Sequence, residues 1–121
     1  MVVVINSKIK SIIENNPLAL ATVNANNTPN VIGVACVKVI SKDQILITDN
    51  FMKQTRKNIL TNPSVCTAVW DKEWNGYKLI GKATYHTTGK WKNKIKSIPE
   101  NNGLAAKGAI VVKISKIIKL C

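Results

Sequence analysis

Short apolar runs separated by turn residues are the feature that most constrains the fold of this chain. The run 29–40 is rich in valine and isoleucine, which favours a buried strand over a helix. The turn-like residues 41–44 then lead into a second strand-like run, 45–48. Residues 108–120 alternate between two faces in the period of a strand. This succession of strand-like runs and turns predicts a fold built largely from β-hairpins.

The complete pattern predicts a mainly β protein. Six runs are expected to form strands, at residues 18–23, 29–40, 45–48, 64–70, 77–87 and 108–120. Three segments have helical spacing, at residues 6–15, 51–60 and 91–98. Six strands joined mostly by hairpins predict an antiparallel barrel with two or three short flanking helices, because closure removes exposed sheet edges.

Length and composition are consistent with a single domain covering residues 1–121. An apolar content of 45% excludes a disordered chain, and no run approaches the roughly 20 apolar residues of a membrane helix. Residues 1–5 have neither the basic start nor the cleavage site of a signal peptide, so a cytoplasmic protein is expected. The odd number of cysteines fits this compartment, with Cys36 and Cys66 expected to be buried and Cys121 exposed.

The net charge of +12 predicts attraction to phosphates without identifying a partner. Every positive charge except Arg56 is a lysine, and aromatic residues are only 5% of the chain, which is unlike a base-reading nucleic-acid binder. The single histidine, His86, and the absence of Cys/His spacing predict no metal site. No paired carboxylates suggest a catalytic acid and base, so no catalytic residue is assigned.

One segment, 48–58, has the chemistry of an anion site, because a strand end leads directly into a helix. Free N–H groups at a helix start attract anions, and Lys53, Gln54, Thr55 and Arg56 add donors within one turn. Ordinary capping of a short helix with a solvated basic face explains the same residues. From the residues alone, both interpretations stay open.

A resemblance to a known family extends over nearly the whole chain. It is carried by these motifs in order: Leu20-Ala-Thr-Val23, Thr28-Pro-Asn-Val31, Val37-Lys-Val39, Ile47-Thr-Asp-Asn-Phe-Met52, Thr55-x-x-Asn-Ile59 with Asn62-Pro63, Val69-Trp-Asp71, Gly76-Tyr77, Gly81-x-Ala83 and Ala106-Lys-Gly-Ala-Ile110. In order and spacing the chain resembles the FMN-binding split-barrel proteins related to pyridoxamine 5'-phosphate oxidase, especially their small members.

The resemblance implies a six-stranded antiparallel split β-barrel and a homodimer with FMN at the subunit interface. It implies a flavoprotein acting in electron transfer or as a small flavin-dependent oxidoreductase, with an unidentified redox partner or substrate. The implied cofactor-binding residues are Gly33, Val34, Ala35, Thr48, Asp49, Asn50, Phe51, Met52, Lys53, Gln54 and Thr55. Larger members have Arg-Lys where this chain has Gln54-Thr55, so Lys53 or Arg56 is expected to supply the missing charge.

The resemblance also limits the function. A tryptophan of the partner chain (Trp70, Trp74 or Trp91) is a candidate to cover the flavin ring, although packing in the core or the interface explains these residues as well. Lys107 is a weaker candidate to reach the cofactor from the other subunit. The chain lacks the C-terminal Arg and His with which vitamin-oxidising members hold their substrate, so oxidation of pyridoxamine 5'-phosphate is not expected. Two alternatives remain: a relative that binds another cofactor, such as heme, F420 or another phosphorylated ligand, and a basic nucleic-acid-binding barrel.

Overall fold

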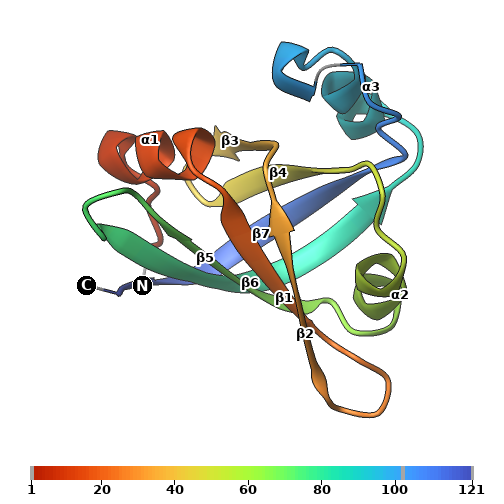
Figure 1. The fold of residues 1–121 in the computed structure, drawn as a ribbon, viewed down its shortest axis with the longest axis horizontal. Helices are drawn as coiled ribbons and strands as arrows, with labels where there is room; N and C mark the ends of the chain where they lie inside the picture. Colours follow the sequence, from red (N-terminus) through yellow and green to blue (C-terminus); the bar gives the residue numbers. More distant parts are fainter. Residues whose placement is uncertain (1, 102, 121) are drawn as a thin grey trace.

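The computed structural model describes residues 2–101 and 103–120 of the chain. Seven strands, three α-helices and one 3-10 helix follow one another in the order shown in Figure 1: α1 (Ser7–Asn15), β1 (Leu18–Val23), β2 (Pro29–Val34), β3 (Val37–Ser41), β4 (Gln44–Asp49), α2 (Gln54–Thr61), β5 (Ser64–Trp70), β6 (Gly76–His86), α3 (Lys90–Lys96), η1 (Pro99–Asn101) and β7 (Gly108–Lys119). None of these described helices is long and apolar enough to cross a membrane.

All seven strands belong to one antiparallel sheet with the order β2-β1-β5-β6-β7-β4-β3. The sheet is strongly twisted and its two ends, β2 and β3, are not hydrogen-bonded to each other, so it forms a split barrel rather than a closed one (Figure 1). The predicted mainly β, antiparallel architecture is therefore confirmed, and of the two or three predicted short helices the described residues form three. The number of strands is one more than predicted.

The extra strand arises because the run 29–40 divides into β2 and β3. Residues of β2 pair with β1, whereas residues of β3 pair with β4 at the other end of the sheet. Ala35 and Cys36 lie between the two strands outside any regular structure. A continuous strand cannot pair with both ends of an open sheet, so the chain breaks where it changes partner. The composition of the run contains no sign of this break.

The main core lies inside the curved sheet and is covered by α1. Ile9, Ile12 and Ile13 of α1 are buried in this core, as their helical spacing predicted. The Asn6 side chain caps the helix by accepting a hydrogen bond of 2.9 Å from the Ile9 N–H. A smaller cluster, formed by Leu46, Ile95, Ala106, Ala109 and Val111, packs α3 against the opposite face of β4 and β7. Strand β4 is therefore buried on both faces, which gives its C-terminal end a rigid position.

Helix α2 begins at Gln54, three residues later than the predicted residue 51. The Asp49 carboxylate accepts a hydrogen bond of 2.8 Å from the Met52 N–H, which holds the residues after β4 in a turn instead of a helix. Helix α3 ends at Lys96, two residues before the predicted residue 98. Cys36 and Cys66 are half-buried, not fully buried as predicted, and Cys121 lies outside the described residues.

Candidate functional site

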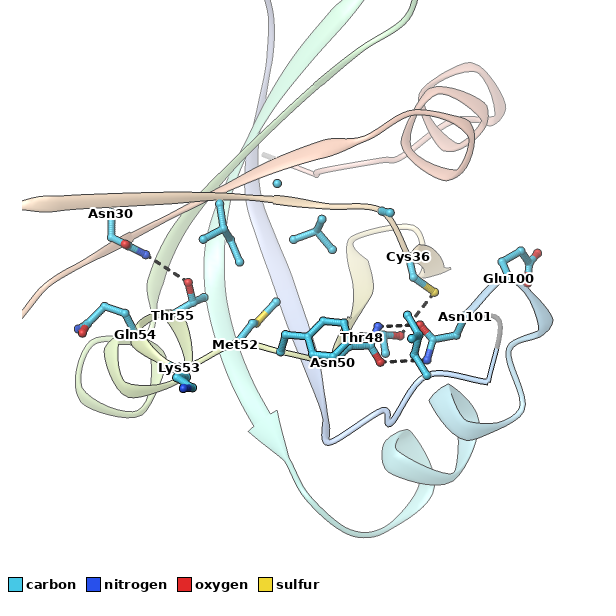
Figure 2. Close-up of a pocket in the computed structure, with 16 residues that line it drawn as sticks. Asn30, Cys36, Thr48, Asn50, Met52, Lys53, Gln54, Thr55, Glu100 and Asn101 are labelled. Carbon is cyan, nitrogen blue, oxygen red and sulfur yellow. Dashed lines mark hydrogen bonds between the residues drawn. The ribbon is translucent and has the colours of Figure 1, made fainter.

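A cavity of about 490 Å³ lies where β2, the end of β4 and the first turn of α2 converge. This volume falls within the range typical of small-molecule sites, about 300–1,000 Å³. Four chain segments line it: Asn30 and Ile32 to Cys36, Thr48, Asn50 to Thr55, and Glu100, Asn101 and Leu104. Figure 2 shows that Met52 lies between two groups of polar side chains, so the cavity has polar ends and an apolar middle.

The first polar end is formed by β2 and the start of α2. The Asn30 amide of β2 donates a hydrogen bond of 3.2 Å to the hydroxyl of Thr55, whose side chain is almost fully buried (Figure 2). Lys53 occupies the N-cap position without a side-chain hydrogen bond to the helix, and no acidic residue lies in the first turn. The N-terminal N–H groups and the Lys53 ammonium therefore give this end the charge that attracts an anion.

The second polar end is held by side-chain amides. Asn50 and Asn101 exchange hydrogen bonds of 2.8 and 3.1 Å, as the paired dashed lines in Figure 2 show. The side-chain oxygen of Asn50, Oδ1, also accepts a hydrogen bond of 2.9 Å from the Ala106 N–H. On the facing wall the Thr48 hydroxyl donates to Cys36 Sγ at 3.6 Å. The segment after α3 is thereby fixed against the end of β4, and it closes one side of the cavity.

Lys53 and Glu100 are the charged residues among the described side chains that line the cavity. The Lys38 ammonium lies 2.7 Å from Glu100, and this hydrogen bond holds the pKa of the Glu100 carboxyl below its usual value. Arg56, the other residue expected to supply charge, lies outside the cavity lining: its guanidinium carbon is 5.3 Å from the ring centroid of Tyr85. A single lysine thus provides the positive charge of the wall.

Asp49 does not line the cavity, although it was expected among the cofactor-binding residues. Its fully buried carboxylate accepts hydrogen bonds from the Tyr85 hydroxyl and from the Met52 N–H. Burial, reinforced by the hydrogen bond to Asp49, raises the pKa of the Tyr85 hydroxyl well above its ordinary value. Asp49 therefore shapes the turn that leads into α2, while its side chain is directed away from the cavity.

The other predicted cofactor-binding residues are brought together around the cavity: Gly33, Val34, Ala35, Thr48, Asn50, Phe51, Met52, Lys53, Gln54 and Thr55. Six further residues line the cavity without having been expected there: Asn30, Ile32, Cys36, Glu100, Asn101 and Leu104. Ile32 and Cys36 had a usable signal, because each is adjacent in the sequence to a residue expected to bind the cofactor. Glu100, Asn101 and Leu104 are far from the other cavity residues in the sequence, and hydrogen bonds between Asn50 and Asn101 hold their segment against the end of β4.

The tryptophans and Lys107 lie away from the cavity lining of their own chain. Trp70 and Trp74 stack on each other with ring centroids 6.1 Å apart, beside the turn between β5 and β6. Trp91 packs against the smaller core cluster. The Lys107 ammonium donates a hydrogen bond of 3.0 Å to the Met52 carbonyl oxygen, so it supports the turn before α2.

The family model described as pyridoxamine 5'-phosphate oxidase matches residues 5–121. The chain belongs to this family. Uncharacterized protein MJ0282 of Methanocaldococcus jannaschii is 33% identical over 112 residues, which cover 89% of this chain and 75% of that protein. The predicted resemblance to pyridoxamine 5'-phosphate oxidase-like proteins is therefore confirmed.

Solved structures of other proteins have the same fold. HupZ of Group A Streptococcus is 25% identical, with a TM-score of 0.89, covering 99% of this chain and 94% of that one. An FMN-binding protein of Syntrophomonas wolfei is 20% identical, with a TM-score of 0.74, covering 93% of this chain and 83% of that one. At 20% identity, the similarity to the Syntrophomonas wolfei protein shows only that the two proteins share a fold.

Proposed function

We propose that this protein binds FMN in the cavity between β2 and α2 and acts as a redox flavoprotein. The observation that carries the proposal is the division of the cavity into a cationic, hydroxyl-bearing end and an apolar middle. FMN has the same division, because a charged phosphate is joined through a polyol to a flat and largely apolar ring. The existence of an FMN-binding protein with this fold supports the assignment.

The phosphate is assigned to the start of α2. Lys53 and the uncapped N–H groups of the first turn favour a dianion there, and the Thr55 hydroxyl adds a neutral donor. This end has fewer cations than the Arg-Lys pair of larger relatives would provide. The helix terminus is therefore assigned a larger share of the charge compensation.

The isoalloxazine ring is assigned to the middle of the cavity, against β2. Val34 and Met52 provide an apolar wall for the ring. Bound FMN supplies one- and two-electron transfer, and protein hydrogen bonds near the ring adjust its potential. The chain itself is assigned the tasks of binding, orienting and shielding the ring, and no residue is assigned as a catalytic acid or base.

A second copy of the chain is proposed to cover the outer face of β2, β1 and β5. On this face Ala21 lies between Val31 and Cys66, and Ala19 lies between Gly33 and Ala68. These side chains are small or apolar, and Val31 is 65% exposed. Such an apolar surface, next to the cavity because Gly33 also lines the cavity, is typical of a homodimer interface.

The cofactor assignment is tested on purified protein by visible spectroscopy and by mass spectrometry of any released chromophore. The expected result is a yellow protein with two visible bands that bleach on reduction and a released mass equal to that of FMN. Apoprotein titrated with FMN should quench the flavin fluorescence at one site per chain. Release of F420 or heme would assign a different cofactor, and a colourless protein that ignores added FMN would refute the proposal.

The phosphate position is tested with the double variant Lys53→Ala/Thr55→Ala. Loss of charge-assisted hydrogen bonds worth about 1.5–3 kcal/mol should weaken FMN binding by about 10- to 100-fold. Lys57→Ala is the matched control, because Lys57 is exposed on the same helix and does not line the cavity. Equal affinities for FMN in the double variant and the control would exclude this position for the phosphate.

The proposed interface is tested with Val31→Lys, which places a charge on the edge strand of the apolar face. Sedimentation should show a dimer for the wild type and a monomer for this variant, with weaker flavin binding. Val2→Lys makes the same exchange at a valine that is 73% exposed and lies outside this face, so it should remain dimeric. A monomeric wild type would contradict the proposed interface.

A further inference from the structure

A network of almost fully buried polar side chains lies directly behind the first polar end of the cavity. The Asn58 amide donates hydrogen bonds of 2.9 Å to the Thr22 hydroxyl and 2.8 Å to the Asn24 carbonyl oxygen. The Asn30 amide donates to Thr22 and to Thr55, each at 3.2 Å. Thr22, Thr55 and Asn58 are each at most 3% exposed. Buried polar groups are costly unless paired, so this network holds Asn30 and Thr55 in defined orientations.

Two hydrogen-bonding groups remain unused at Asn30 and Thr55, the residues of this network that line the cavity. Both amide protons of Asn30 are used by the two threonines, whereas its carbonyl oxygen has no hydrogen-bond partner among residues 2–101 and 103–120. The Thr55 hydroxyl accepts from Asn30, and its own proton is donated to no described residue. Helical threonines often donate to the carbonyl four residues earlier, but here that residue, Phe51, precedes the helix.

Asn30 and Thr55 therefore present one acceptor and one donor side by side (Figure 2). We propose that Asn30 sets the specificity of this end for a phosphorylated polyol: its carbonyl oxygen accepts from a polyol hydroxyl beside the phosphate already assigned to Thr55. Asn30 thereby also acts as a positioning residue, because its amide occupies an acceptor site of Thr55 and directs the Thr55 proton toward the ligand. This inference rests on the proposed function and adds the specificity of its phosphate end.

The chemistry of the pair predicts different effects on ligands that share one ring system. Lumichrome has the flavin-like ring alone, riboflavin adds the polyol, and FMN adds the phosphate. Thr55→Val removes the donor at constant shape. It should lower the affinity for FMN at least 10-fold, while the affinities for riboflavin and lumichrome stay within about twofold of the wild type. Asn30→Leu removes both the carbonyl acceptor and the amide that positions Thr55. It should lower the affinity for riboflavin about fivefold and the affinity for FMN at least 30-fold, without changing the affinity for lumichrome.

The experiment measures the affinities of the three ligands by fluorescence quenching, and of ribitol 5-phosphate by calorimetry, for the wild type and each variant. Thr55→Ser keeps the hydroxyl and should restore FMN affinity to within about threefold of the wild type. In the double variant Asn30→Leu/Thr55→Val the loss of FMN affinity should be smaller than the product of the two single losses, because Asn30 acts partly through Thr55. If Asn30→Leu does not fold, Asn30→Asp tests the same point, since its carboxylate would accept the Thr55 proton and lower FMN affinity relative to riboflavin.

The outcomes separate this inference from the proposed function. Equal losses of affinity for all three ring ligands would overturn the roles given to Asn30 and Thr55. A loss of FMN affinity in the double variant equal to the product of the two single losses would do the same. Neither result would contradict the proposal that the protein binds FMN. A wild type that ignores the ring compounds but binds ribitol 5-phosphate, with loss in both single variants, would refute the flavin assignment and support the polyol-phosphate site. Binding of none of the four probes would overturn both.

Discussion

The hydrogen bond between Tyr85 and Asp49 offers a direct test of how the site is supported. The Asp49 carboxylate is fully buried at the end of β4, and it accepts from the Tyr85 hydroxyl and from the Met52 N–H. The variant Tyr85→Phe removes only the hydroxyl and leaves the ring that faces Arg56. One oxygen of the buried carboxylate then loses its partner, while the bond to Met52 remains.

The expected loss of stability follows from this geometry. Hydrogen bonds to charged groups contribute about 1.5–3 kcal/mol, and a buried acceptor left without a partner lies toward the upper part of that range. We therefore expect Tyr85→Phe to lower the free energy of unfolding by about 2 kcal/mol. For a domain of this size, such a loss lowers the unfolding temperature by about 6–12 °C.

Urea denaturation monitored by tryptophan fluorescence measures this change, with thermal unfolding as a second assay. Tyr77→Phe is the matched control, because Tyr77 lies on the same strand, is half-buried, and makes no hydrogen bond through its hydroxyl to any described residue. The control should change stability by less than about 0.5 kcal/mol. Equal urea midpoints for the two variants would refute the argument that Asp49 depends on Tyr85.

The same hydrogen bond predicts the alkaline behaviour of the protein. The pKa of Tyr85 is raised in the folded state, mainly by burial and then by Asp49, so folding favours the protonated hydroxyl. Its contribution to stability is complete below the ordinary tyrosine value of 10.0 and is lost as the pH rises above it. Stability should therefore fall less steeply above pH 10 in Tyr85→Phe than in the wild type, and parallel profiles would contradict this assignment.

Two further predictions concern the packing of the sheet and the stability of the protein at acid pH. Gly81→Ala should lower the free energy of unfolding by more than about 2 kcal/mol in urea denaturation, because its Cβ would collide with the backbone carbonyl of Lys113 on β7. A Cβ at Gly33 meets no atom of its own chain within 4 Å, so Gly33→Ala should lower it by less than about 1 kcal/mol. The pKa of Asp71 is lowered chiefly by a hydrogen bond from Asn75, so its stabilising effect is present above its ordinary value of 3.8 and is lost as the pH falls below it. Asp71→Asn should therefore lose less stability than the wild type between pH 4 and pH 2, and equal losses would show that this carboxyl is not involved.

The local elements of this fold were readily predicted from the sequence. Three isoleucines at helical spacing behind Asn6 form α1, and the predicted strand 64–70 matches β5 residue for residue. These features depend on side-chain periodicity and capping within one segment, so neighbouring residues contain enough information. The same holds for most of the residues around the start of α2, which are adjacent in the chain and line the cavity together.

Features that depend on distant segments were not predictable in this way. The break between β2 and β3 exists because each strand pairs with a different end of the sheet, and Asp49 is directed away from the cavity because Tyr85 reaches it from β6. Asn30 meets Thr55 across 25 positions of sequence. The sequence by itself determined which segments become strands and helices, because that choice is made by local periodicity. Only the tertiary structure decided which polar groups pair inside the protein and which remain available to a ligand, because hydrogen bonds form between atoms that folding brings within about 3 Å.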